Sequence, residues 1–127
     1  MRIQVDKIID KNSNIIVEFS SEFGKAMAFW EGEKPIVNNE YHVEIDIRST
    51  LIWSKEIQKA ESNKPIIQQG NDFIQISGRI DSIDDDGYVT LRVGEYIVPF
   101  IASGTPFQIG EHVTLTAKEI SLSPVDY

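Results

Sequence analysis

Hydrophobic and polar residues alternate with a period of two along most of the chain. The stretch YHVEIDI, residues 41–47, places its apolar side chains in one phase and its charged and polar side chains in the other. Similar runs recur about every ten residues, between short polar segments such as DKNSN and SGTP. Strict alternation is typical of antiparallel strands with one face buried and one face in water. The pattern therefore predicts an all-β protein, built as a small antiparallel barrel or a sandwich.

Two residues in the second half refine this prediction. Gly94 lies between two strand-like runs, where a tight hairpin needs a residue with positive φ. Pro99 lies inside the run IVPF and predicts an edge strand or a bulge, because proline cannot donate a hydrogen bond to a ladder.

The alternation stops between residues 49 and 70. Trp53, Ile57 and Ala60 follow the i, i+4, i+7 spacing of a helix face, and Ser49 or Thr50 could cap its beginning. We therefore predict one short helix within residues 50–61, although the stretch LIW could equally form a short strand.

An internal repeat gives the expected organisation of the chain. Residues Pro35–Ile47 align with Pro106–Ala117, and each is preceded by a strand, an acidic turn and a second strand. We expect one compact body over residues 1–127, in which two similar β repeats pack together because units of about 50 residues rarely hold a core alone. The repeats span residues 1–48 and 73–122, with a connector at 49–72 and a tail at 123–127. Similar strand periodicity alone could also produce this match.

Acidic residues outnumber basic ones, and they concentrate in the second half. The chain carries 20 acidic and 12 basic residues, a net charge of −8. Residues 65–127 contain nine acidic and only three basic residues. Such a balance disfavours binding to phosphate backbones and would steer a basic protein partner toward the second half. Solubility alone is the simpler interpretation of the same charge.

Three consecutive aspartates, Asp84, Asp85 and Asp86, precede Gly87 between two strand-like runs. An EF-hand loop with this glycine at its sixth position would need a glutamate at position twelve, where the chain has valine. Asp-Gly between alternating runs is instead a strong hairpin signal, so we predict a turn. With Asp81 and Glu95, the three aspartates flank one predicted hairpin, and these five acids are our candidates for contacts with a partner.

The chain lacks the usual signatures of an active site. It contains no cysteine, no G-x-S-x-G, no glycine-rich phosphate loop and no H-E-x-x-H, so we expect no enzymatic activity, no metal and no cofactor. No run of 18 apolar residues occurs, and the first ten residues do not resemble a signal peptide. We therefore expect a cytoplasmic protein that does not enter membranes.

Trp30 and Trp53 are the remaining candidates for partner contacts. Tryptophan is enriched at the energetic centres of protein interfaces. It is also an ordinary core residue at the ends of barrels, and this alternative stays open for both.

Two resemblances add to this picture. The runs AMAFWEGEKPIVNNEYHVEIDI and LIW, followed by GYVTLRVGEYIVPF and F-x-I-G-E-H-V-x-L, resemble small uncharacterised bacterial proteins of the toxin-immunity type. The second half also resembles the strands of small barrels of the OB type, which bind oligonucleotides.

Together these features lead to two functional expectations. The first is a non-enzymatic, acidic protein-binding domain, an immunity-type inhibitor of a basic bacterial toxin. The alternative is an OB-like barrel that binds a small ligand or single-stranded nucleic acid, although the low number of basic residues makes nucleic acid the weaker choice.

Overall fold

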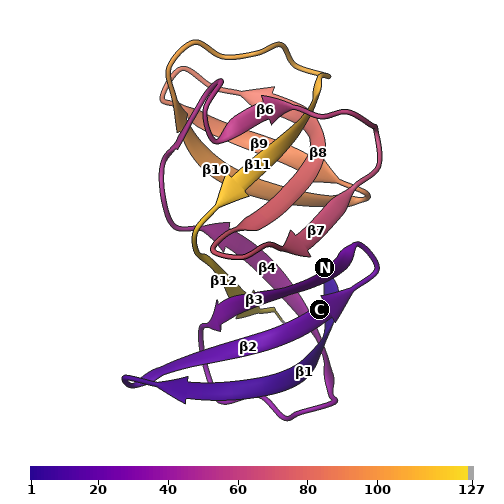
Figure 1. Ribbon diagram of the computed structural model, residues 1–127, viewed down its shortest axis with the longest axis vertical. Helices are drawn as coiled ribbons and strands as arrows, with labels where there is room; N and C mark the ends of the chain where they lie inside the picture. The colour runs from indigo at the N-terminus through magenta and orange to yellow at the C-terminus, as the bar shows by residue number, and fades with distance from the viewer. Residues whose placement is uncertain (126–127) are drawn as a thin grey trace.

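The computed structural model describes residues 1–125, which form two β-barrels stacked along the long axis of the molecule (Figure 1). These residues contain no helix, and so none that is long and apolar enough to cross a membrane. The strands are β1 (Arg2–Lys11), β2 (Asn14–Ser21), β3 (Gly24–Trp30), β4 (Glu40–Ile47), β5 (Leu51–Ile52), β6 (Ile57–Lys59), β7 (Ile66–Gln69), β8 (Ile74–Ile83), β9 (Tyr88–Val93), β10 (Tyr96–Ser103), β11 (His112–Ala117) and β12 (Ile120–Pro124).

The first barrel, barrel 1, is a closed sheet in the order β1-β2-β3-β12-β4. Its first three strands form an antiparallel meander, and β4 returns to pair with β1, which is the arrangement of a Greek key. The remaining gap is filled by β12, which runs parallel to β3 and antiparallel to β4. The predicted alternation is visible in the burial of β2, where Val17 and Phe19 are fully buried and their neighbours are not.

The second barrel, barrel 2, repeats this order with the other strands. β8, β9 and β10 form the meander, and β11 returns to pair with β8. The gap between β10 and β11 is filled by residues 51–59, because β5 runs parallel to β10 and β6 runs antiparallel to β11. The sheet is thereby nearly closed, and β7 pairs with β8 as an additional strand.

Each barrel is completed by a strand from the other half of the chain. β5 and β6 directly follow β4 of barrel 1, but they close barrel 2. Conversely, β12 directly follows β11 of barrel 2, but it closes barrel 1; in Figure 1 its yellow ribbon lies among the indigo strands of the lower barrel. The two halves therefore exchange their closing strands reciprocally.

This exchange bears on the expected boundaries. The strands β1–β4 and β8–β11 correspond in order and pairing, and they lie within the expected repeats 1–48 and 73–122. The expected connector 49–72 holds β5, β6 and β7, and the last strand extends to Pro124 within the expected tail. Residues 126–127 of that tail lie outside the described residues.

The predicted helix within residues 50–61 is wrong. The segment instead forms β5, a turn over residues 54–56, and β6, with a parallel bridge between Trp53 and Ile57. Both residues are buried, because the turn brings the chain back to the same core after four residues. The four-residue spacing of Trp53 and Ile57, which resembles that of a helix face, thus arises from this turn between two strands.

The two barrels are joined by the β2–β3 hairpin. The backbone N–H of Ile67 in β7 donates to the carbonyl oxygen of Phe23 at 3.1 Å, and the Phe23 ring meets Tyr96 of β10 edge-on at 6.1 Å. Gly24 has φ +136°, and a Cβ at this position would collide with the carbonyl oxygen of Ile67. The buried side chains of both barrels accordingly belong to one hydrophobic cluster.

We predict that the two barrels unfold together. Leu122 of β12 is fully buried in barrel 1, and Leu122→Ala should lower the free energy of unfolding by about 2–5 kcal/mol. The chain has two tryptophans, Trp30 in barrel 1 and Trp53 in barrel 2. Urea unfolding followed by fluorescence in Trp30→Phe and Trp53→Phe backgrounds therefore reports on each barrel separately.

The two fluorescence transitions should coincide, and Leu122→Ala should move both by the same amount. Leu115→Ala, at a fully buried position of β11 in barrel 2, is the matched control and should also move both. If Leu122→Ala shifts only the Trp30 signal, the barrels are independent units and the exchanged strands do not couple them.

Candidate functional site

The structure confirms that the three aspartates form the β8–β9 turn. The Asp84 carboxylate accepts hydrogen bonds from the backbone N–H groups of Asp86 and Tyr88, at 2.9 and 3.0 Å. The backbone N–H of Gly87 donates to the Asp84 carbonyl oxygen at 3.3 Å. Asp84 therefore organises the turn, while the side chains of Asp85 and Asp86 are exposed at its tip. Within residues 1–125, no group of three or more acidic or histidine side chains is arranged to hold a metal ion.

The other two candidate acids are separated from this turn. Asp81 lies at a register shift in β8, where its carboxylate pairs with Arg92 through Nε at 3.2 Å. Glu95 lies in the tight β9–β10 turn beside Gly94, whose φ of +62° is the positive value predicted for that hairpin. The six-residue strand β9 separates Glu95 from the aspartate turn by about 20 Å. The five acids thus form no single acidic patch.

Both tryptophans are core residues of their barrels. Trp30 is 6% exposed, packs edge-on against Tyr41 and donates from Nε1 to the Glu33 carbonyl oxygen at 2.7 Å. Trp53 is equally buried and packs against Phe107, with ring centroids 5.2 Å apart. Replacing either one would act first on stability, so partner contacts through them would require the barrel to open.

An exposed apolar surface on β9 and β10 was not predicted from the sequence. Ile97, Pro99 and Ile101 point outward from β10, and Tyr88 of β9 is the direct cross-strand neighbour of Ile101. Ile52 of β5 continues the row, because it pairs with Ser103 at the end of β10. Ile97, Ile101 and Ile52 are about 40% exposed and Tyr88 is 55% exposed. We call these five residues the β9–β10 patch.

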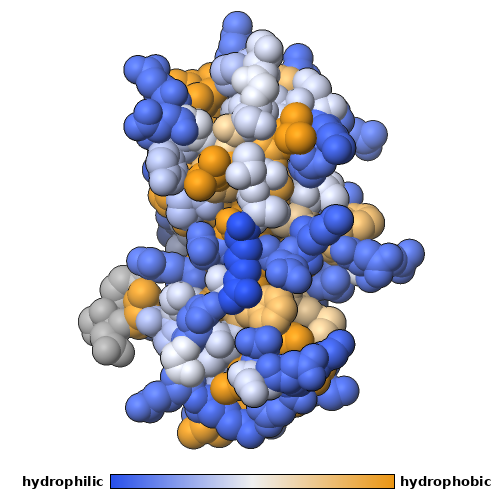
Figure 2. Space-filling model, turned by 90° about the vertical axis from the view of Figure 1, so that its left-hand side faces the viewer, coloured by the Kyte–Doolittle hydropathy of each residue, from blue (hydrophilic) through white to orange (hydrophobic). Residues whose placement is uncertain are grey.

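Large apolar side chains are costly to leave in water, so we treat this exposed row as a candidate contact surface. Hydrophobic groups are exposed on the upper barrel in the view of Figure 2, above a mainly hydrophilic band between the barrels. The sequence contains the signal for this patch, because YIVPFIA is apolar in both phases of its alternation. One phase, Val98, Phe100 and Ala102, is buried, and the other is left outside.

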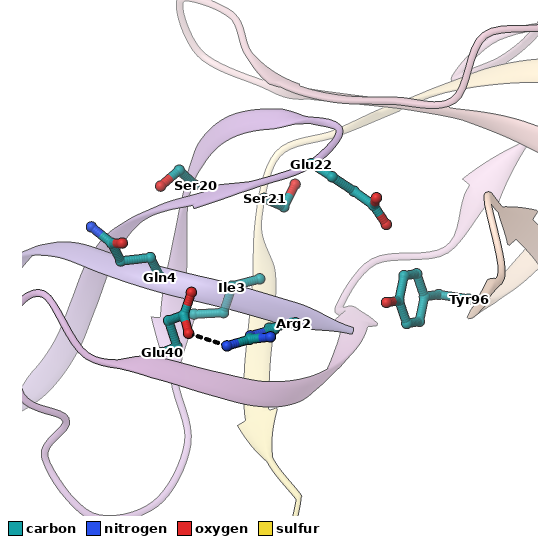
Figure 3. Close-up of a pocket in the computed structure, with 8 residues that line it drawn as sticks. All are labelled: Arg2, Ile3, Gln4, Ser20, Ser21, Glu22, Glu40 and Tyr96. Atoms are coloured by element: carbon teal, nitrogen blue, oxygen red, sulfur yellow. Dashed lines mark hydrogen bonds and ion pairs between the residues drawn. The ribbon is translucent and has the colours of Figure 1, made fainter.

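A polar hollow lies between the barrels. It has a volume of about 430 Å³ and is lined by Arg2, Ile3, Gln4, Ser20, Ser21, Glu22, Glu40 and Tyr96. Figure 3 shows the Tyr96 hydroxyl and the Glu22 carboxylate directed into this space, and the Arg2–Glu40 ion pair along its side. The Ser20 hydroxyl donates to Asp6 and that of Ser21 to the Gly24 carbonyl oxygen. The Ser21 hydroxyl thus helps to hold the β2–β3 turn in shape, and the Ser20 hydroxyl ties β2 to β1.

A smaller hollow, of about 280 Å³, separates β4 from β10. At its edge the Met1 amino group donates to the Val43 carbonyl oxygen at 2.8 Å. Burial lowers the pKa of this amino group, since a charged group is disfavoured away from water, and the Glu44 carboxylate acts in the opposite direction.

In comparisons with protein-family models, curated proteins and solved structures, no match to this chain was found.

The three aspartates should differ in their effect on stability. Asp84→Ala removes the acceptor of two backbone N–H groups and should lower the free energy of unfolding by about 1–2 kcal/mol, as the loss of a comparable cap does. Asp84→Asn keeps an oxygen acceptor and should cost much less. Asp85→Ala and Asp85→Asn, at an exposed position, should change it by less than about 0.5 kcal/mol.

Urea unfolding of the four variants at pH 7 measures these differences. Equal losses for Asp84→Ala and Asp85→Ala would show that the carboxylate of Asp84 does not hold the turn.

Proposed function

We propose that the protein is a non-enzymatic binding domain that captures a basic protein partner on the β9–β10 patch. The observation that carries this proposal is the continuous row of exposed apolar side chains on one sheet face, beside the aspartate turn. Tyr88 and Ile101 lie at the end of the hairpin nearest Asp84–Asp86, so an apolar contact and a negative rim are adjacent. A partner with an apolar surface edged by lysine or arginine complements both.

The charge of the whole chain supports the same partner. A net charge of −8 attracts a basic protein over long distances, and the two exposed aspartates at the tip add a local field. With the resemblance to toxin-immunity proteins, we infer an immunity-type inhibitor that neutralises a basic bacterial toxin in the cytoplasm. Inhibition would follow from covering the toxin surface and requires no chemistry from this chain.

The edge of β10 is less suited to binding than its face. β5 pairs only with Ala102 and Ser103, so the edge of β10 before these residues has no strand partner within the described chain. Pro99 lies in the middle of this edge and has no N–H to donate, which is a common protection against adding another strand. The partner is therefore expected to pack on side chains of the face.

A second candidate function follows from the strand order. A five-stranded Greek-key barrel is the architecture of OB domains, which bind ligands on the face of their second and third strands. In barrel 2 these strands are β9 and β10, so the patch occupies that face. Nucleic acid is the weaker ligand for this face, because Arg92 is its basic residue on β9 and β10 and its charge is already paired with Asp81. A gel mobility assay at low salt, with a single-stranded oligonucleotide, distinguishes the two candidate functions. A clear shift would favour nucleic acid binding over the capture of a protein partner.

The first test of the proposal concerns the apolar contact. A partner is captured from the native host, purified and measured by binding kinetics with Ile97→Thr/Ile101→Thr. Threonine keeps the β-branched shape, so the fold should be preserved. We expect affinity to fall by about tenfold or more, mainly through faster dissociation. Ile36→Thr/Ile109→Thr, at two loop isoleucines that are 62% and 63% exposed, is the matched control and should change nothing.

Equal affinity of the patch variant and wild type would contradict the proposed surface. Capture of a protein from the lysate would not support the proposal unless the purified partner is basic and loses affinity for the patch variant.

The second test concerns electrostatic steering. Asp84→Asn/Asp85→Asn/Asp86→Asn should slow association with the same partner by about tenfold at low salt, and leave dissociation nearly unchanged. At 0.5 M salt the difference should largely disappear, because the Debye length falls to about 4 Å. A control that removes the same charge at exposed positions elsewhere, Glu33→Gln/Glu61→Gln/Asp72→Asn, should slow association less.

An association rate that does not depend on either salt or the three aspartates would mean that the acidic charge serves solubility alone.

A further inference from the structure

Basic side chains lie side by side across the outer face of barrel 2, although this half of the chain is acidic. Arg79 of β8 is directly opposite Arg92 of β9 and, on its other side, directly opposite His112 of β11. Residues 65–127 contain only three basic residues, and two of them are thus neighbours in register. Like charges directly opposite each other destabilise a sheet, so this arrangement has a cost that an anion would relieve.

Asp81 relieves the repulsion only in part. Its carboxylate contacts Nε of Arg92 at 3.2 Å and NH2 of the same residue at 3.4 Å, whereas NH2 of Arg79 lies 4.0 Å away. One carboxylate therefore faces two guanidinium groups. Glu111, the residue before β11, is engaged elsewhere, since its carboxylate pairs with Lys59 at 3.6 Å and accepts from the backbone N–H of Gln108.

The basic row opens onto a hollow of the right scale for a small anion. This hollow has a volume of about 260 Å³ and is lined by Asn63, Pro65, Gly78, Arg79, Arg92, Gly94 and His112. Asn63 and Pro65 come from the connection between β6 and β7, so the floor is the sheet and one wall is a loop. The Arg79 side chain is 49% exposed and that of Arg92 is 38% exposed, which leaves both reachable from solvent.

We propose that this hollow binds a small oxyanion, a phosphate or a carboxylate group, held between the guanidinium groups of Arg79 and Arg92. A planar guanidinium presents paired N–H donors that match the oxygen spacing of both groups. His112 and Asn63 line the same hollow, and an imidazole and an amide side chain would offer further donors to the anion. Together with the Asp81 carboxylate, the bound anion would neutralise the two positive charges of Arg79 and Arg92. This proposal does not rest on the proposed partner.

The test is a titration of the isotopically labelled protein, followed by nuclear magnetic resonance at pH 7. Inorganic phosphate and, separately, malonate are added at an ionic strength held constant with sodium chloride. We expect saturable shifts at the side-chain Nε–H groups of Arg79 and Arg92 and at the backbone of His112. The phosphate and malonate arms show which oxyanion is preferred.

Two variants localise the effect. Arg79→Gln should weaken binding of the preferred probe by about tenfold or more, since its interaction with Asp81 is long and its loss should leave the fold intact. Arg48→Gln removes the same charge from barrel 1, where Arg48 pairs with Glu31 and lies over the Phe29 ring, and should bind as tightly as wild type.

Thermal unfolding gives an independent readout. In chloride, Arg79→Gln should be at least as stable as wild type, because one of two opposed like charges is gone. The preferred probe should raise the melting temperature of wild type and of Arg48→Gln, but not that of Arg79→Gln. Shifts that do not saturate with either probe, or that are equal in wild type and Arg79→Gln, would overturn the proposal.

Discussion

The structure depends on one constraint, which is that neither barrel can close without a strand from the other half of the chain. A four-stranded Greek key leaves a gap between its third and fourth strands, and this gap exposes both backbone polar groups and the core. Residues 51–59 fill the gap in barrel 2, and residues 120–124 fill it in barrel 1. Each half thus supplies what the other lacks. The β2–β3 hairpin packs with Phe23 against β7 and Tyr96, as expected for two barrels that share strands and must therefore lie in contact.

The same closure shapes the outer face of barrel 2. Because β5 is only two residues long, it covers the end of β10 and leaves the rest of that strand's edge unpaired. Pro99 protects the edge, while Ile97 and Ile101 remain exposed on the face. Across the neighbouring strands the surface changes character, from the apolar patch to Arg92 and Arg79. One sheet therefore carries an apolar, a negative and a positive area.

Much of this architecture could be predicted from alternation and turn chemistry. The period of two identifies strands because it reports which side chains face a core, and the turns at Asp84 and Gly94 follow from local backbone preferences. Strand exchange could not be predicted, because alternation is the same whichever sheet a strand joins. The spacing of Trp53 and Ile57 misled for a related reason, since a tight turn between two strands also returns two side chains to one core after four residues. The apolar patch was readable in YIVPFIA, but only once one phase of that strand was known to be buried.

The exchanged strands also determine the order in which the two barrels can close while the chain is synthesised. The strands of barrel 1 up to Ile47 are made early, but barrel 1 cannot close until Ile120–Pro124 has been synthesised. Roughly 75 residues separate the end of β4 from the end of β12, and at about 5–20 residues per second the ribosome needs some 4–15 s to add them. During this interval the open edges of β3 and β4 are available to other nascent chains. A protein of this topology therefore passes through a stage of synthesis in which two strand edges of barrel 1 still lack their partner strand.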